Sequence, residues 1–222
     1  MPLPRLPGTT FGAGSVTAGI RSHSLENCYR SVLANLRLGG NYRNQERETS
    51  RPLIKMGNIG RGSIDLEKVQ YIPDDADVDE EDRLIDGDLL FNTRNTLELV
   101  GKVAMRRGDL PNAYYNSNLL RLKFKEAKIA NNFFANCVLN TKAAISQLKG
   151  FATGTTSVAA IYTRDLLNLR LQVPLLEEQR AIAIVLSDMD AEIAALEARR
   201  DKTKAIKQGM MQELLTGRIR LV

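Results

Sequence analysis

The side chains best suited to bind a ligand are basic and amide residues that stand in or beside glycine-rich and polar loops. Arginine and lysine match the acceptor edge of guanine, and asparagine matches the edge of adenine, so these residue types could contact bases in the major groove of DNA. The candidates are Lys55, Asn58, Arg61, Arg94, Asn95, Lys102, Arg106, Arg107, Asn116 and Asn118. Each of them alone could equally be a solvated surface residue, or an asparagine favoured by a turn conformation.

A second pattern is that of a metal-dependent hydrolase. Asp109 is followed seventeen residues later by Glu126, Ala127 and Lys128. In an Asp…Glu-x-Lys site, carboxylates hold magnesium and a lysine assists the attacking water. One such spacing arises often by chance in a chain with 26% charged residues. A metal-dependent nuclease is therefore the lesser alternative.

The sequence lacks the motifs that other classes of catalytic or metal site require. The acidic run of residues 74–82 has neither the glycine at the sixth position nor the glutamate at the twelfth that an EF-hand needs, so we expect a solvated loop without metal, facing away from DNA. The residues 131–134, Asn-Asn-Phe-Phe, lack the prolines of a methyltransferase loop and are expected on a helix. His23 is the only histidine, which makes a catalytic triad improbable. We expect no catalytic residue and no metal ligand.

The elements that must position these side chains are short. Between residues 25 and 173, apolar runs separated by turns predict mostly strands with one or two helices. Residues 52–62 predict a strand that leads into a Gly-Asn-Ile-Gly loop, and residues 86–95 predict a turn, a buried strand and a polar loop. Residues 117–125 alternate as a strand does, whereas residues 128–148 have helical length and spacing.

From Pro174 onward the pattern changes to one very long amphipathic helix. Glu177 and Glu178 suit the positive end of a helix dipole, and Gly217 is the expected stop. Apolar residues recur in a heptad-like seam, which predicts a coiled coil or a bundle. Forty residues would reach about 60 Å, so the helix needs a partner along much of its length. The residues expected to bind that partner are Gln179, Ile182, Leu186, Met189, Ile193, Leu196, Ile206 and Met210.

Composition supports a soluble, intracellular chain without indicating a function, and the charge pattern predicts a basic globular part. The 222 residues are 43% apolar, without a stretch long enough to span a bilayer, and Cys28 and Cys137 suit a reducing cytoplasm. Residues 174–222 hold eight basic and eight acidic side chains, so the net charge of +5 belongs to residues 1–173. Without the seven carboxylates of the acidic run, that part has a charge of 5 + 7 = +12. One of its surfaces should be clearly positive.

Two sets of motifs resemble a known family. The helix begins with Pro174, Glu178, Gln179 and Arg180 and closes on Lys207, Gly209, Met211, Leu214, Leu215, Thr216, Gly217 and Ile219. This sequence pattern resembles the conserved-region helix that ends the specificity subunits of type I restriction-modification systems. Residues 37–44, 52–72, 87–104 and 154–161 resemble the target-recognition domain of the same subunits.

The resemblance implies an α+β fold, with a strand-rich globular domain followed by one long helix that packs against partner helices. It divides the chain into a flexible tail (1–24), a DNA-binding target-recognition domain (25–173) and a conserved-region helix (174–222). Full specificity subunits generally have two such domains and two such helices, so this sequence resembles a half-size form. Whether that form is natural or a truncated gene product stays open.

The resemblance also implies a function without catalysis. The chain would read one half of a bipartite target in double-stranded DNA and position modification subunits, which hold S-adenosylmethionine and methylate adenine. A restriction subunit is a further possible partner, and this chain itself would bind no cofactor. The helix would pair with a second copy, or with a different half subunit. The alternative from another class is a coiled-coil adaptor whose globular domain binds protein.

Overall fold

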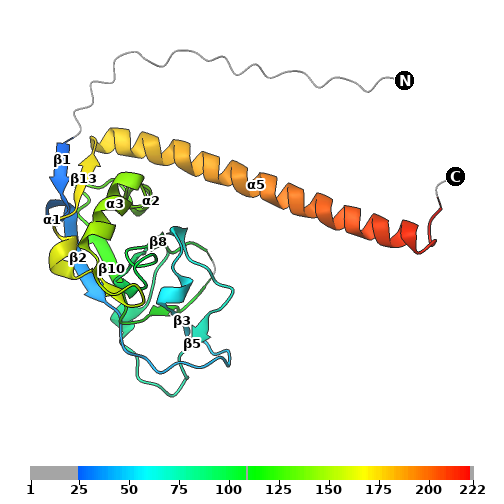
Figure 1. Cartoon of the computed structure of the whole chain (residues 1–222), viewed down its shortest axis with the longest axis horizontal. Coiled ribbons are helices and arrows are strands. Elements are labelled where there is room, and N and C mark those ends of the chain that lie inside the picture. Colours follow the sequence, from blue (N-terminus) through cyan, green and yellow to red (C-terminus); the bar gives the residue numbers. More distant parts are fainter. Residues whose placement is uncertain (1–24, 109, 221–222) are drawn as a thin grey trace, which may run out of the picture.

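The computed structural model describes residues 25–108 and 110–220, and side chains from residue 31 onward. The expected tail (1–24), with His23, therefore lies outside the described residues, as does Asp109 of the hydrolase pattern. A globular domain is followed by a single long helix that projects far beyond it (Figure 1). This arrangement confirms the predicted α+β class with one long C-terminal helix.

The domain is built from short elements. Its strands are β1 (Leu25–Cys28), β2 (Leu33–Leu38), β3 (Pro52–Ile54), β4 (Gly62–Ser63), β5 (Gln70–Tyr71), β6 (Leu89–Asn92), β7 (Arg94–Asn95), β8 (Val103–Met105), β9 (Tyr114–Tyr115), β10 (Leu119–Phe124), β11 (Thr153–Gly154), β12 (Ala159–Ala160) and β13 (Arg170–Val173). Its helices are α1 (Tyr29–Val32), η1 (Met56–Asn58), η2 (Glu80–Asp82), α2 (Asn132–Leu139), α3 (Lys142–Phe151) and α4 (Thr163–Leu166). The long helix is α5 (Leu176–Leu215).

The main sheet has the strand order β2-β10-β6-β8-β4. The pairs β2–β10, β10–β6 and β6–β8 are antiparallel, and the edge strand β4 runs parallel to β8. Three smaller sheets surround it, with the orders β5-β3-β9, β11-β12-β7 and β1-β13. Since β13 leads directly into α5, its pairing with β1 fixes the place where the helix leaves the domain.

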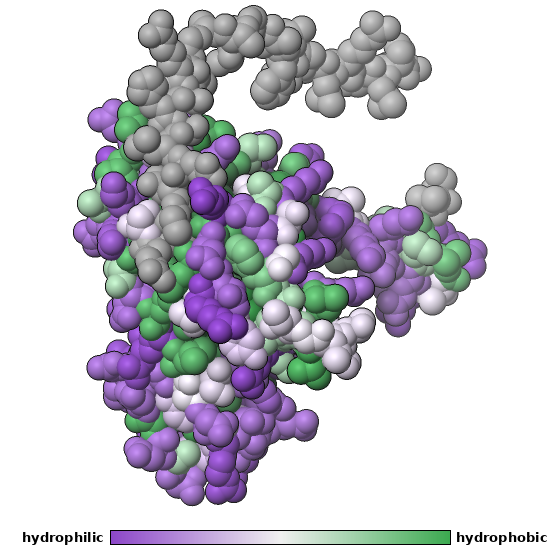
Figure 2. Space-filling model, turned by 60° about the vertical axis from the view of Figure 1, so that its left-hand side comes forward, coloured by the Kyte–Doolittle hydropathy of each residue, from purple (hydrophilic) through white to green (hydrophobic). Residues whose placement is uncertain are grey.

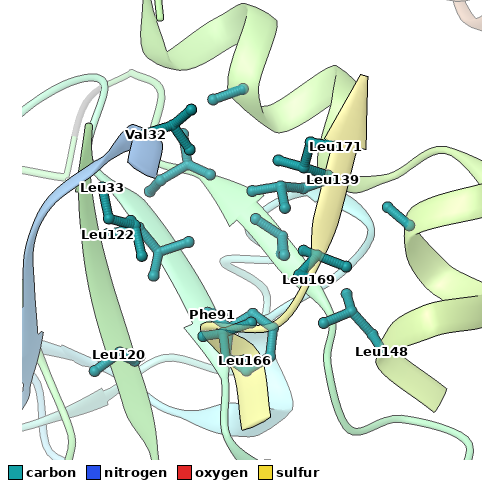
Figure 3. Close-up of a cluster of buried hydrophobic side chains, with 14 of the residues drawn as sticks. Val32, Leu33, Phe91, Leu120, Leu122, Leu139, Leu148, Leu166, Leu169 and Leu171 are labelled. Atoms are coloured by element: carbon teal, nitrogen blue, oxygen red, sulfur yellow. The ribbon is translucent and has the colours of Figure 1, made fainter. Parts of the chain in front are cut away.

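Both faces of the main sheet are buried, because successive side chains of a strand point to opposite faces. Leu89 and Phe91 of β6 pack in the cluster that contains Leu139 of α2 and Leu148 of α3, and Figure 3 shows this side of the sheet. Leu90, between them, packs in a second cluster around β3 and β9. Burial on both faces explains why the strand reads as an unbroken apolar run.

Most predicted elements are confirmed, with small changes of boundary. The strand expected in residues 117–125 is β10, and the buried strand expected in residues 86–95 is β6. The helix expected in residues 128–148 is two helices, since Thr141 accepts a hydrogen bond from the backbone N–H of Ala144 and so caps a new start. The helix expected at residues 131–134 is confirmed as α2, whose N-cap is Asn131.

The ends of α5 agree with the sequence patterns. Glu177 and Glu178 occupy its first turn, two and three residues after the N-cap Leu175. At the other end Gly217 has φ +73°, which a residue with a side chain rarely adopts. The Gly217 N–H donates to Leu214 O at 3.3 Å and the Arg218 N–H donates to Glu213 O at 3.0 Å. These two bonds form a Schellman motif, so the predicted stop is confirmed.

Gln179 anchors the start of α5 to the domain. Its side chain is 1% exposed, accepts from the Ala130 N–H at 2.9 Å, and donates to Lys128 O and Pro174 O at 2.9 and 2.8 Å. One turn later Ala183 joins the main core cluster, and Ile182 packs against that cluster. Gln179 thus serves the fold of its own chain rather than contact with a partner.

Replacing Gln179 with Leu should destabilise the domain. The substitution leaves the partly buried Ala130 N–H and the carbonyls of Lys128 and Pro174 without their partner, which costs about 2–3 kcal/mol of unfolding free energy. Thermal unfolding followed by circular dichroism should show a melting temperature lower by roughly 6 °C. Gln212→Leu, at an exposed position of the same helix, is the matched control. Equal melting temperatures for the two variants would refute the anchoring role.

The acidic run is more ordered than the sequence indicates. Arg37 binds three of its carboxylates, those of Asp79, Glu81 and Asp82, at 2.6, 2.5 and 2.9 Å. The buried Asp82 also accepts from the Tyr42 hydroxyl at 2.6 Å. The prediction of a solvated loop is therefore wrong for Asp82, which is buried, whereas Asp79 and Glu81 stay exposed while they pair with Arg37. In the described part of the chain no cluster of three or more acidic, histidine or cysteine side chains could hold a metal ion.

Two further expectations concern single features. Cys137 is half-buried, and burial raises the pKa of its thiol, which suits a packing role. Among the residues that the structure describes, none of the helices combines the length and apolarity that a bilayer crossing requires.

Candidate nucleic-acid interface

Five of the ten predicted DNA-contacting residues gather at one end of the main sheet. The antiparallel neighbours β6, β8 and β10 bring together the end of β6 at Asn92 and the starts of β8 and β10 at Val103 and Leu119. The chain segments just outside these strand ends carry the candidates. We call the resulting set the sheet-end surface, and its members are Arg94, Asn95, Lys102, Asn116 and Asn118.

Backbone hydrogen bonds hold this surface together. The N–H and hydroxyl of Thr93 both donate to Asn118 O, at 3.0 and 2.8 Å, so Arg94 lies beside Asn118. The Asn118 N–H donates to Asn116 Oδ1 at 3.1 Å, and the Asn92 N–H donates to Lys102 O at 2.9 Å. The side chains are thus carried on segments tied to a rigid sheet, which favours precise contacts with a ligand.

The side chains of the sheet-end surface carry hydrogen-bond donors without a partner among the described residues. Arg94 is exposed, and neither its guanidinium nor the Lys102 ammonium has a partner among the described residues. Asn95 and Asn116 use their Oδ1 atoms to accept backbone N–H groups at 2.8 and 3.1 Å, which leaves their Nδ2 donors available. The sheet-end surface therefore offers two cations and three amides. These are the kinds of group that contact phosphates and base edges in protein–DNA complexes.

The loop of residues 39–45 borders the same surface and was not among the predicted contacts. Gly40 forms a bridge with Asn116. A Cβ atom at Gly39 would lie 2.2 Å from Tyr115 O, so only glycine allows the loop to approach this closely. The loop presents Arg43, which is exposed. The two glycines of this loop could have predicted from the sequence that it packs closely against another segment. They could not have indicated which strand that segment is.

Lys55 lies near the sheet-end surface but is partly engaged. The Asn116 N–H donates to Ile54 O at 3.1 Å, which places the next residue, Lys55, close by. The Lys55 ammonium donates to Gln70 Oε1 at 2.8 Å. Asn58 is only 5% exposed and uses its amide within the loop, with Oδ1 accepting from Lys55 N and Nδ2 donating to Asp65 O. Asn58 therefore shapes the loop instead of facing a ligand.

Three predicted contacts lie elsewhere. Arg106 and Arg107 follow the opposite end of β8, and Arg106 is largely buried, donating to Leu110 O at 2.6 Å. Arg107 stacks on Phe133, 4.6 Å from the ring centre, and pairs with Asp190 of α5 at 3.3 Å. Arg61 is exposed beside the edge strand β4 and lines a cavity with both arginines. The ten candidates therefore do not form a single surface.

The hairpin β11–β12 completes the neighbourhood of Arg94. Strand β12 pairs with β7, so Ala160 lies opposite Arg94 and Ala159 opposite Asn95. One threonine of this hairpin stabilises the turn between its strands. Thr155 Oγ1 accepts from the Val158 N–H at 3.2 Å. Its hydroxyl therefore supports the turn.

The predicted partner-binding seam is mostly open to solvent. Met189, Ile193, Leu196, Ile206 and Met210 are each about half exposed, from 47% to 57%. Figure 2 shows hydrophobic residues among hydrophilic ones where α5 projects beyond the domain. Ile182 and Leu186, nearer the domain, are half-buried. An isolated helix with this much apolar surface is poorly stabilised in water, so the geometry favours association.

These features define a class of protein in which a domain with a candidate ligand-binding surface is followed by a long helix whose apolar residues are available for association. The family model described as "Type I restriction modification DNA specificity domain" matches residues 25–207. The chain therefore belongs to the type I restriction-modification specificity family, and the resemblance read from the sequence is confirmed.

Two curated relatives come from Methanocaldococcus jannaschii. The putative type I restriction enzyme MjaX specificity subunit is 29% identical over 191 residues, which cover 84% of this chain and 44% of that protein. The type I restriction enzyme MjaVIII specificity subunit is 29% identical over 173 residues, covering 76% and 40%. The chain thus spans less than half the length of these relatives.

Solved structures show the same fold. The S subunit of the type I restriction-modification system from M. genitalium aligns with a TM-score of 0.61 at 16% identity, covering 89% of this chain and 47% of that one. The HsdS subunit from Thermoanaerobacter tengcongensis aligns with a TM-score of 0.54 at 16% identity, covering 85% and 47%. The chain is thus grouped with specificity subunits, which are not the catalytic subunits of such systems.

Proposed function

We propose that this chain reads one half of a bipartite target in double-stranded DNA and positions the catalytic subunits of a type I restriction-modification complex. The observation that carries the proposal is the convergence of Arg94, Asn95, Lys102, Asn116 and Asn118 on one end of a rigid sheet, with hydrogen-bond donors left available. The chain would act without catalysis and without a cofactor of its own, in the cytoplasm where its DNA lies.

The chemistry of the sheet-end surface supports DNA in particular. Exposed arginine can bind guanine O6 and N7 with two hydrogen bonds, and asparagine amides can pair with adenine. Lys102 and the neighbouring Arg43 would contact phosphates and fix the register. Three carboxylates of the acidic run, those of Asp79, Glu81 and Asp82, pair with Arg37.

Helix α5 supports the second half of the proposal. A second copy related by a twofold axis could pair its seam with this one, which would place two reading domains at a fixed separation. A different half subunit could pair in the same way and would give an asymmetric target. Modification subunits, which would hold S-adenosylmethionine and methylate adenine, are the proposed partners of this assembly, with a restriction subunit as a further one.

Binding of duplex DNA should weaken steeply with salt. Each phosphate contacted contributes about −0.9 to the slope of log K against log salt concentration, so phosphate contacts by Lys55, Lys102 and Arg43 predict a slope of roughly −3 per half-site. Fluorescence anisotropy over a salt series, with a duplex chosen by methylation-sensitive sequencing of the host genome, measures it. A slope near zero, or no methylated bipartite motif, would contradict DNA reading.

A coiled-coil adaptor is the alternative that the exposed seam of α5 alone would favour. Such a protein would associate through the same seam and bind a protein through its domain. It would show no preference among duplex sequences at any salt concentration. The anisotropy experiment therefore separates the two functions.

A further inference from the structure

We infer that the ion pair between Arg107 and Asp190 is a strut that sets the angle between α5 and the recognition domain, and thereby selects the spacing between the two half-sites. The first part concerns this chain alone. The second part rests on the proposed function, because a spacing exists only if two half-sites are read. In this role Arg107 is a positioning residue rather than a DNA contact.

Besides the packing of α5 on α2, two groups of contacts connect the helix to the domain. The first is the anchor at its start, where Gln179 makes three hydrogen bonds and Ala183 enters the core. The second is Asp190, eleven residues beyond Gln179 and so about 16 Å further along the helix. Beyond Asp190, the described hydrogen bonds and ion pairs of α5 stay within the helix and its C-terminal turn. The contacts of Gln179 and Ala183 act as a pivot for α5, and the Arg107–Asp190 ion pair fixes the helix at a second point along its length.

Arg107 is well placed for this role. Its backbone follows β8, where the Arg106 N–H donates to Asp88 O at 2.8 Å and the Gly87 N–H donates to Arg106 O at 2.9 Å. Its guanidinium lies 4.6 Å above the ring centre of Phe133 in α2. Both terminal nitrogens reach the same Oδ2 atom of Asp190, at 3.3 and 3.4 Å. Stacking on Phe133 restricts the side chain before it meets Asp190, so little conformational freedom is lost on pairing.

The space on both sides of Arg107 leaves the ion pair as the polar contact that holds α5 at this point. A cavity of about 390 Å³ is lined by Arg61, Met105, Asn136 and Asp190, and a more open one of about 710 Å³ is lined by Ala130, Arg180, Ala183 and Ile184. Arg107 and Phe133 line both. Tightly packed side chains would hold a helix from all sides. Here α5 lies against α2 near its start, and further along the helix the Arg107–Asp190 ion pair is the charged contact that bridges the space between the domain and α5.

The length of α5 amplifies a change at the strut. A helix of 40 residues is about 60 Å long, so a tilt of roughly 10° about its start moves its far end by about 10 Å. Ten ångströms correspond to about three base-pair steps of DNA. A companion domain held at the far end would shift by that amount. A modest change of angle therefore suffices to alter the permitted spacer.

The strut can be removed without unfolding the chain. Both side chains are about half exposed, at 48% and 53%, and an ion pair in this setting contributes little to stability. Arg107→Met keeps the length and the apolar contact with Phe133 but removes the charge. Asp190→Arg places two like charges together, and combining it with Arg107→Asp restores an opposite pair. Arg180→Met, at another arginine beside the cleft, is the matched control.

The first test measures the angle in the full-length chain. Spin labels are placed on Lys149→Cys in α3 and Lys204→Cys in α5, both at exposed positions, in a chain whose own cysteines are replaced by Cys28→Ser and Cys137→Ala. Double electron–electron resonance, with dilution by unlabelled chain, then measures the distance between the two labels of one chain. Residue 204 lies about 37 Å beyond Gln179, so a 10° freedom should widen the distribution by about 6 Å in Arg107→Met and Asp190→Arg. The charge-swapped pair should restore the narrow distribution. An unchanged distribution in both folded single variants would overturn the strut.

The second test measures spacing. Duplexes with the host motif and spacers altered by one or two base pairs are compared by anisotropy. The parent chain and Arg180→Met should prefer one spacer, whereas Arg107→Met should bind several with similar affinity. A widened distance with an unchanged spacer preference would overturn the spacing consequence alone. Absence of any DNA binding by the parent chain would refute the proposed function, and the distance measurement would still decide the strut.

Discussion

Replacing Ile193 and Leu196 with Asp should convert an assembled chain into a monomer. Both side chains are exposed, at 53% and 57%, and lie on the seam of α5. In a homodimer four such side chains would be buried, and each contributes about 1.5 kcal/mol or more. Their loss, about 6 kcal/mol in all, corresponds to a roughly 10⁴-fold weaker association. Size-exclusion chromatography with light scattering at micromolar concentration measures the result.

The matched control adds the same charges on the other side of the helix. Ala191 and Ala198 are exposed and lie off the seam, so Ala191→Asp with Ala198→Asp should assemble as the parent chain does. Circular dichroism should show that the domain of both double variants stays folded. A parent chain that is strictly monomeric, alone and with the modification subunit, would contradict the association proposed for α5.

Arg94→Ala should lower the affinity for the cognate duplex by roughly 10- to 100-fold and relax the preference at one base position. The expectation follows from the loss of a two-bond contact to guanine, which discriminates by about 1–3 kcal/mol. Because the Arg94 side chain is exposed, its removal leaves the core intact. Competition binding against duplexes substituted at each position measures both effects.

Lys123→Ala is the control for this experiment. Lys123 is exposed near the opposite end of β10 from Asn118, so its removal changes the net charge equally without touching the sheet-end surface. Its affinity for the cognate duplex should fall much less. Equal losses for the two variants would mean that Arg94 acts through general charge rather than through base contacts.

The sequence predicted elements where one physical pattern dominated. The apolar run of β6 was recognisable because burial on both faces imposes it directly. Strand β10 was recognisable from the alternation of Leu120, Leu122 and Phe124, although Leu119 and Arg121 between them are buried as well. The start and end of α5 were recognisable because acidic first turns and a terminal glycine have local causes. The helix expected in residues 128–148 is divided in two because a single capping threonine, Thr141, acts within an otherwise helical pattern.

The candidate site was predicted only in part, because contacts between distant segments leave no local pattern. Residue type alone did not separate Arg94, which is free at a strand end, from Arg107, which is paired with Asp190 83 residues away. It also did not indicate that Arg37 would neutralise part of the acidic run. The buried positions of Asn58 and Gln179 depend in the same way on the assembled fold.

The division between a sheet buried on both faces and polar residues beyond its strand ends has a consequence for engineering. Substitutions at positions 94, 95, 116 and 118 alter groups outside the hydrophobic clusters, so at 94 and 118 they should cost little folding free energy. At 95 and 116 they also remove a side-chain acceptor of a backbone N–H, which costs about 1 kcal/mol each. A combinatorial library at these four positions can thus be screened for new preferences while most of its members keep the parent scaffold. Tolerance of this kind would let new specificities arise without a redesign of the protein.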